Sequence, residues 1–234
     1  AFVAILVDRR ALLVSGLLAV GIGRPILRFR GYHLAVATLA IGVIVAVIAN
    51  NEVGWTGGPD GMPVERMTLF GWRLRGVETW YWIAGGALVL ATLLVANLLA
   101  SPTGRALRAI HDSEVAAGVL GIDVARYKLV AFVVSAELAT LAGAFLALFD
   151  GHVTPVVGGV LRSVEFVTMA VLGGLGSILG SIVGTAILVV LPQMLTVFKD
   201  YEYAILGAIM IAVMIGLRRG IVPSLAALAG RSSR

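Results

Sequence analysis

Hydrophobic residues in this chain form long runs that short polar segments separate. A helix needs about 20 residues to cross the roughly 30 Å of hydrocarbon in a bilayer. Runs of this length, or close to it, predict membrane-spanning helices at 2–23, 32–49, 80–100, 130–149 and 178–198. Two shorter apolar runs lie at 164–175 and 204–217. The pattern predicts an all-α fold, a polytopic transmembrane helical bundle with about six or seven membrane segments.

Two of these runs are irregular. The first is interrupted by Asp8-Arg9-Arg10, three charges that are costly at the centre of a bilayer. The run at 164–175 is too short for an upright crossing, and Gly173 and Gly174 within it can unwind the backbone. We therefore predict a broken helix there.

The glycines that follow have a regular spacing. Gly176, Gly180 and Gly184 recur at every fourth position on one face of the predicted helix 178–198. Small residues at this spacing let a second helix approach closely, so the stripe predicts helix packing.

Composition agrees with a membrane protein. Hydrophobic residues make up 59% of the 234 residues and charged residues 13%, with a mean hydropathy of +1.01. Soluble domains are roughly half apolar and a quarter charged, and they could not bury this much apolar surface. The chain has no cysteine and its three histidines are isolated, so the sequence predicts no metal site and no catalytic site.

The net charge of +5 is concentrated in short connections between the predicted helices. Cytoplasmic loops of membrane proteins carry an excess of Lys and Arg, so the charge indicates topology rather than binding to nucleic acid. We predict 24–30, 101–128 and 218–234 on the cytoplasmic side and the polar connection 50–79 on the opposite side. Three tryptophans are predicted interface anchors: Trp55, Trp72 and Trp80.

The polar segment 101–128 is the most informative connection. Residues 104–120 are predicted to form short amphipathic helices. The two faces carry different side chains, Leu107, Ile110 and Glu114 on one and Arg105, Arg108 and Asp112 on the other.

Small residues follow in the same segment. Ala116 and Ala117 allow another helix to approach, and Gly121 is placed to stop a helix. We predict a docking element whose members are Gly104, Arg105, Arg108, Glu114, Ala116, Ala117 and Gly121. The residues alone leave a second interpretation open, in which this is an ordinary cytoplasmic loop whose arginines only set the topology.

Polar and small residues inside the predicted spans are candidates for lining a substrate path. They are Thr38, Gly42, Glu137, Gly173 and Gly174. Each has an alternative: a hydrogen bond between helices or a proton site for Glu137, and packing of small residues for the others. Glu165, at the entrance of the short run, is predicted to cap a helix N-terminus.

Several motifs resemble those of one family. EVAAGVLGI at 114–122 is similar to the E-x-A-A-x-x-x-G loop through which permeases of ABC importers bind their ATPases. Four further motifs, in the family's order, resemble the LivM-type branched-chain amino-acid permeases: RFRGYHLAVATLAIG (28–42), TGGPDGM (56–62), GRALRAI (104–110) and VLGGLGS (171–177). The resemblance spans residues 28–222. The N-terminal spans usual in that family are absent and the chain begins at Ala1, so we expect an N-terminally truncated sequence.

The resemblance implies the permease subunit of an ABC importer in the bacterial inner membrane, a single permease domain over 1–234 that forms the path for branched-chain or related amino acids. It implies partner ATPase subunits that bind ATP and Mg, a second permease subunit and an external solute-binding protein. It implies no enzyme activity and no cofactor in this chain, which lacks a GxxxxGK[ST] phosphate loop. One alternative is an ABC permease for another small polar solute, such as a sugar or urea. A secondary transporter, which should carry ion-coupling groups near the middle of the membrane, is the other.

Overall fold

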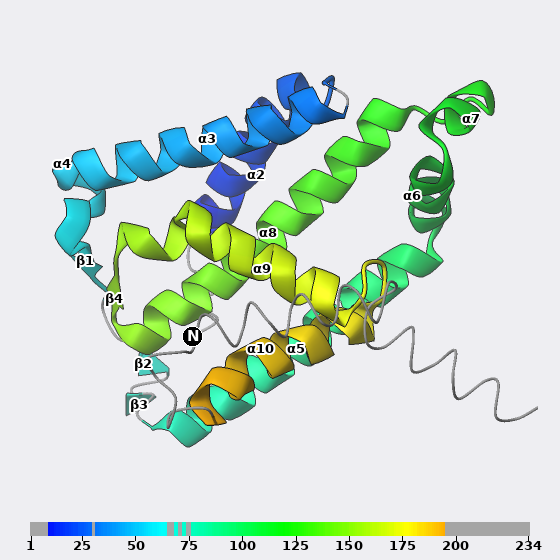
Figure 1. Ribbon diagram of the computed structural model, residues 1–234. Helices are drawn as coiled ribbons and strands as arrows, with labels where there is room; N and C mark the ends of the chain where they lie inside the picture. Colours follow the sequence, from blue (N-terminus) through cyan, green and yellow to red (C-terminus); the bar gives the residue numbers. More distant parts are fainter. Residues whose placement is uncertain (1–8, 30, 65–67, 70–71, 74–75, 195–234) are drawn as a thin grey trace, which may run out of the picture. The chain divides into compact units, whose positions relative to one another are not determined.

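The computed structural model describes residues 9–29, 31–64, 68–69, 72–73 and 76–194 (Figure 1). Contacts divide the chain into two compact units, Ala1–Val157 and Gly158–Arg234, and each is described by itself. The prediction of a single permease domain stays a prediction.

The first unit is mainly helical. Its longer helices are α2 (Arg9–Ile26), α3 (Tyr32–Asn51), α5 (Val77–Ala100) and α8 (Val124–Asp150). Its shorter helical elements are α4 (Val53–Thr56), η1 (Gly58–Asp60), α6 (Pro102–Asp112) and α7 (Glu114–Val119). Among the described residues of this unit, four short strands form two antiparallel pairs, β1 (Met62–Pro63) with β4 (His152–Val153) and β2 (Thr68–Leu69) with β3 (Trp72–Arg73). The turn η2 (Pro155–Gly158) leads into the second unit, which has α9 (Val160–Gly173) and α10 (Ile178–Met194).

Three helices in the described part are long and apolar enough to cross a membrane. They are α3, α5 and α8, with 20, 24 and 27 residues and mean hydropathies of 2.3, 2.2 and 2.1. Shorter apolar stretches lie in α2 and α10. The all-α membrane fold is confirmed, although these described spans are fewer than predicted. The predicted run 204–217, Asp8 of the predicted interruption and the ends of 2–23 and 178–198 lie outside the described residues.

Two helices start earlier than the sequence predicted. α5 begins at Val77 and α8 at Val124. Asp123 explains the start of α8, because its carboxylate accepts a hydrogen bond from the backbone N–H of Arg126 at 3.1 Å, which is the bond of an N-cap. The last five residues of the predicted polar segment 101–128 therefore belong to α8.

α2 packs against α8 through small residues (Figure 1). The buried positions of α2 follow helical spacing: Ala19, Gly23 and Ile26. A Cβ atom at Gly16 would lie 2.6 Å from Oε1 of Glu137, and one at Gly23 would lie 2.9 Å from Cδ1 of Phe132. Glycine at these two positions lets the helices approach this closely.

Trp80 differs from its prediction. Its side chain is buried, and its ring meets Phe149 of α8 edge to face, with centroids 5.9 Å apart. Trp80 thus joins the start of α5 to the end of α8 instead of anchoring the chain at an interface. The side chains of Trp55 and Trp72 lie outside the described part.

The connection from α3 to α5 is fixed to the end of α8. β1 pairs with β4, placing Met62 opposite Val153. A ring nitrogen of His152 lies 2.8 Å from the backbone oxygen of Asp60. Gly61 has φ +74, and a Cβ atom there would collide with the carbonyl of Val153. The turn of the TGGPDGM motif therefore requires glycine at this position.

In its described part, the second unit is a hairpin of α9 and α10 whose backbones touch at glycines. A Cβ atom at Gly173 would collide with the carbonyl of Gly180, and one at Gly184 would collide with the carbonyl of Met169. Gly174, with φ +117, ends α9. The predicted break in this region is present.

The predicted stripe of glycines is only partly correct. Gly180 and Gly184 do pack against α9. Gly176 lies outside the stripe, because α10 begins only at Ile178 and Gly176 is in the preceding turn, with φ +85. No neighbouring atom of the described residues would lie within 4 Å of a Cβ there.

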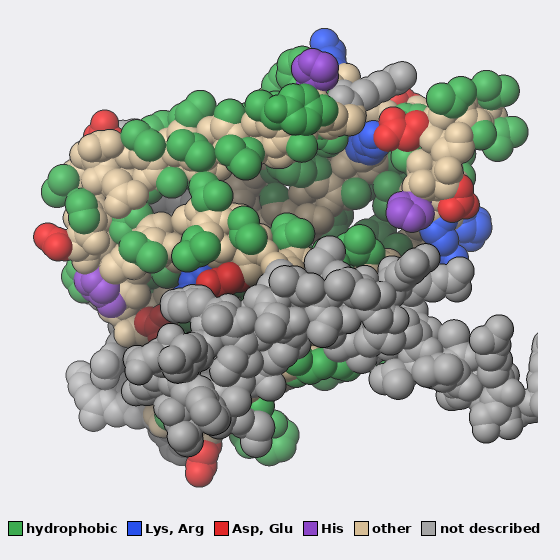
Figure 2. All heavy atoms as spheres, in the orientation of Figure 1, with side chains coloured by type: hydrophobic (Ala, Val, Ile, Leu, Met, Phe, Trp, Pro, Cys, Tyr) green, Lys and Arg blue, Asp and Glu red, His purple; other side chains and the backbone are tan. Residues whose placement is uncertain are grey.

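Much of the apolar surface faces outward. α3 has no buried residue. Figure 2 shows hydrophobic side chains along the visible face of α3. A lipid bilayer or a neighbouring subunit supplies the apolar surroundings that such a helix needs.

Candidate functional site

The segment between α5 and α8 consists of two short helices, α6 and α7, as predicted (Figure 1). The hydroxyl of Ser101 starts α6, since it accepts a hydrogen bond from the N–H of Gly104 at 3.4 Å. Pro102 follows at the first helical position, which it favours. Gly104 is buried, and a Cβ atom there would collide with the backbone of Leu99. The joint between α5 and α6 therefore depends on glycine at position 104.

Arg105 and Arg108 both contact the end of α5. Nη1 of Arg105 donates to the carbonyl of Ala100 at 3.4 Å, and Nη2 of Arg108 donates to the carbonyl of Leu99. The last carbonyls of a helix lack partners within it and carry the negative end of its dipole, so cations stabilise them. The two arginines hold α6 against α5, and their part in docking stays a prediction.

Ser113 separates α6 from α7. Its backbone is extended, and its hydroxyl accepts a hydrogen bond from the N–H of Ala116 at 3.2 Å. Because of this break, Glu114 begins a new helix. The predicted stripe that joined it to Leu107 and Ile110 is therefore wrong.

The two alanines of α7 lie in different surroundings. Ala117 is 1% exposed, whereas Ala116 is exposed. Gly121, with φ +81, ends the helix, and its N–H bonds the carbonyl of Gly118 at 3.0 Å. The N–H of Ile122 bonds the carbonyl of Ala117 at 3.0 Å, which completes a Schellman motif. The predicted helix stop at Gly121 is confirmed.

Glu114 forms an ion pair that the sequence did not reveal. Its Oε1 lies 2.5 Å from Nζ of Lys128 in α8. The pair joins the start of α7 to the second turn of α8, so α7 is held to both neighbouring segments.

An exposed apolar surface on α7 was also missed. Val115, Val119 and Leu120 are 74%, 84% and 78% exposed, and we call these three residues the α7 tip. Val115 and Val119 are four residues apart and share one helix face. Two apolar residues at helical spacing within a polar connection were the sequence signal for this surface. The prediction considered only the polar and small residues of the connection.

Thr38 and Gly42 lie on α3, which is continuous through both positions. The hydroxyl of Thr38 donates to the carbonyl of Ala35 at 2.9 Å, and no atom of another described segment lies within 4 Å of a Cβ at Gly42. A surface of this kind can line a path or receive a neighbouring helix. Their place on the substrate path stays a prediction.

Glu137 meets α2. The hydroxyl of Ser15 lies within hydrogen-bond distance of its Oε1, at 3.3 Å, beside Gly16. This contact supports the alternative of a hydrogen bond between helices. A part for Glu137 in the path stays a prediction.

The remaining path candidates, Gly173 and Gly174, lie where α9 ends. The backbone of Gly173 packs against that of Gly180, and a part for the two glycines in the path stays a prediction.

Glu165 is not the predicted cap, because α9 begins at Val160 and Glu165 lies in its second turn. Its carboxylate pairs instead with Arg162, at 2.9 Å.

Comparison with known proteins places the chain in a family. The family model described as "Branched-chain amino acid transport system / permease component" matches residues 3–214. The high-affinity branched-chain amino acid transport system permease protein LivM of Salmonella typhimurium is 33% identical over 235 residues, covering 90% of this chain and 55% of the relative. Its LivH counterpart is 35% identical over 124 residues, covering 52% of this chain and 40% of the relative.

A third relative carries a different name. The autoinducer 2 import system permease protein LsrC of Klebsiella pneumoniae is 32% identical over 195 residues, covering 79% of this chain and 52% of the relative. No solved structure matches. The chain spans about half the length of LivM and LsrC. Because the family model covers most of the chain, the resemblance first inferred from the motifs is confirmed, and the chain belongs to the family of branched-chain amino acid transport permease components.

Proposed function

We propose that this chain is a membrane-spanning permease subunit of an ABC importer for branched-chain or related amino acids. The family match over residues 3–214 carries the proposal. The chain works in the bacterial inner (plasma) membrane with a second permease subunit and an external solute-binding protein. Partner ATPase subunits bind ATP and Mg, and this chain has no ATPase site or other enzyme activity of its own.

The α6–α7 segment has the features of a lever between an ATPase and the spans. The α7 tip offers bare apolar surface to a partner. Behind it, the Gly104 joint and two arginine bonds connect α6 to α5, and the ion pair of Glu114 with Lys128 connects α7 to α8. Movement of the tip is therefore transmitted to two spanning helices, which suits alternating access driven by closure of an ATPase dimer.

Sidedness tests this arrangement first. The chain has no cysteine, so a cysteine introduced by Val115→Cys or Val156→Cys is its only thiol. Both valines are exposed, at 74% and 68%. We expect a membrane-impermeant maleimide to label the cysteine at position 115 only from the cytoplasm and the one at position 156 only from outside. Labelling of position 115 from outside would exclude contact with an ATPase.

Docking is tested by Val119→Asp, with Val156→Asp as the matched control on the opposite side. Placing a charge in an apolar contact is unfavourable, so we expect Val119→Asp to reduce co-purification with the ATPase and amino-acid uptake at least tenfold. Val156→Asp should leave both unchanged. Ala117 is unsuitable for this test, because it is buried within the chain. Wild-type assembly and uptake by Val119→Asp would reject the assignment.

A second candidate is an ABC permease for another small polar solute. The similarity to LsrC over 79% of this chain favours it. Uptake of radiolabelled leucine and of a radiolabelled sugar by the reconstituted transporter, each measured with the other solute unlabelled as competitor, separates the two. Sugar uptake that unlabelled leucine does not inhibit, without leucine uptake, would identify the second candidate.

A further inference from the structure

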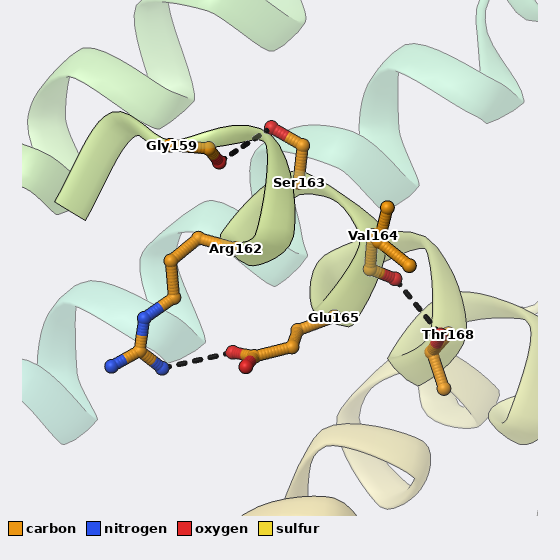
Figure 3. Close-up of polar contacts among 6 residues, drawn as sticks. All are labelled: Gly159, Arg162, Ser163, Val164, Glu165 and Thr168. Atoms are coloured by element: carbon orange, nitrogen blue, oxygen red, sulfur yellow. Dashed lines mark hydrogen bonds and ion pairs between the residues drawn. The ribbon is translucent and has the colours of Figure 1, made fainter. Parts of the chain in front are cut away.

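α9 carries an ion pair with no assigned role. Nη1 of Arg162 lies 2.9 Å from Oε2 of Glu165, and Figure 3 shows the two side chains side by side, off the same face of the helix. The side chains are 59% and 38% exposed. The pair is therefore accessible to a ligand.

Structural needs do not account for these charges. An exposed ion pair adds little to folding stability. Apart from the pair, α9 carries only Ser163 and Thr168 as polar side chains. The pair lies in the first two turns of α9, at the predicted outer end of the short run 164–175, where charged side chains can stay hydrated and contact an entering solute. The pair is thus a candidate contact for a charged solute.

Both groups retain free hydrogen-bonding capacity. A guanidinium has five N–H donors and a carboxylate has two acceptor oxygens, and the described part of the chain gives each group a bond only to the other. The neighbouring hydroxyls are occupied, since Ser163 donates to the carbonyl of Gly159 at 3.4 Å and Thr168 to that of Val164 at 2.8 Å (Figure 3). This face of α9 therefore presents one cationic and one anionic group to a ligand.

Apolar side chains flank the pair. Leu161 lies four residues before Glu165, and Phe166 lies four residues after Arg162, so each is a neighbour on the helix surface. They are 71% and 61% exposed. The face therefore combines opposite charges with apolar surface on both sides.

We propose that Arg162 and Glu165 bind the two charged groups of an α-amino acid with an apolar side chain, and this rests on the proposed function. The guanidinium receives the α-carboxylate and the Glu165 carboxylate receives the α-ammonium, while Leu161 and Phe166 contact the aliphatic part. Carboxylate binding by arginine is charge-assisted, and the ammonium supplies the matching donors for glutamate. On the predicted topology α9 begins at the outer side, so the pair meets the solute as it enters.

The test uses the complete transporter in proteoliposomes, with saturating solute-binding protein and radiolabelled leucine. The variants are Arg162→Gln, Glu165→Gln and the double variant, with Ser163→Ala as the matched control on the same turn. Two rates are measured, leucine uptake and ATP hydrolysis. Loss of one charge-assisted hydrogen bond corresponds to about a tenfold effect or more. We expect uptake to fall at least tenfold in all three charge variants, with ATP hydrolysis within twofold of wild type and Ser163→Ala unchanged.

The outcomes separate the inference from the proposed function. Wild-type uptake by the double variant, or recovery of uptake when the two single variants are combined, would show that the pair is only structural and overturn the inference. A parallel fall of uptake and ATP hydrolysis would overturn it too. A wild-type transporter that imports no amino acid would overturn the proposed function, and this inference with it.

Discussion

The α6–α7 segment and the α9–α10 hairpin are both pairs of consecutive helices, yet they are held together by different forces. Ser101 and Ser113 cap the helices of the first pair, two arginines bond carbonyls of α5, and Glu114 pairs with Lys128. In the second pair the backbones touch at Gly173, Gly180 and Gly184.

The difference follows from the surroundings that we propose for each pair. Polar side chains can be solvated at the cytoplasmic surface, so capping and charged contacts cost little there. Inside a bilayer apolar surface gives no drive for helices to associate, and close packing of small residues replaces it. Each helix pair nevertheless has an exposed surface with its own chemistry. In the α6–α7 segment it is the apolar α7 tip, and in the α9–α10 hairpin it is the Arg162–Glu165 ion pair.

The largest loss of folding stability is expected from a substitution in the α9–α10 hairpin. Gly173→Val would drive a side chain into the backbone of Gly180, and overpacking of this kind costs about 3 kcal/mol. The thermal unfolding midpoint of the purified protein in detergent measures it. Gly143→Ala is the control, because no atom of another segment in the described part lies within 4 Å of a Cβ there. An unchanged midpoint for Gly173→Val would mean that the helices do not touch at this glycine.

The Gly104 joint comes next. Gly104→Ala places a Cβ against the backbone of Leu99, for an expected loss of about 2 kcal/mol in unfolding free energy. Gly118→Ala in α7 is the matched control, since it meets open space and alanine favours a helix by up to about 1 kcal/mol. The control should be neutral or stabilising, and equal losses in both variants would contradict a special role for Gly104.

Gly121 tests the end of α7. Its φ of +81 is unfavourable for residues with a Cβ, so Gly121→Ala is expected to cost about 1 kcal/mol. Gly121→Asn should lower the unfolding free energy by less than Gly121→Ala, because asparagine tolerates this conformation better. Thermal unfolding of both variants gives the comparison, and similar losses would argue against the left-handed backbone.

The smallest effect is expected for the ion pair between Glu114 and Lys128. Both side chains are partly exposed, so a double-mutant cycle of Glu114→Gln and Lys128→Met should give a coupling energy of about 0.5 kcal/mol. The coupling should weaken at high salt. A coupling that persists at high salt would indicate a more buried contact than the structure shows.

The apolar runs predicted helices at the right places because a bilayer imposes one requirement on every span. Apolar length alone predicted the second span at 32–49. The helix α3 starts at the same residue, Tyr32, and ends two residues later than predicted. The same signal located the starts of α5 and α8 too late, because polar residues occupy their first turns, among them Glu78 in α5 and Arg126 in α8. Asp123 caps α8, whereas α5 starts after Gly76 without a side-chain cap. Gly121 was correctly predicted as a helix stop, because the left-handed conformation that ends a helix depends on the local presence of glycine and not on distant segments.

Sequence by itself determined the membrane class of this protein, the approximate spans and, through its motifs, the permease family. The tertiary structure alone decided that Ala117 is buried while Ala116 is exposed, that Arg105 and Arg108 bond the end of α5, and that Glu137 meets Ser15. Hydropathy and periodicity describe one helix at a time. The partner of a side chain depends instead on which segments the fold brings together, and Ser15 and Glu137 are 122 residues apart in the chain.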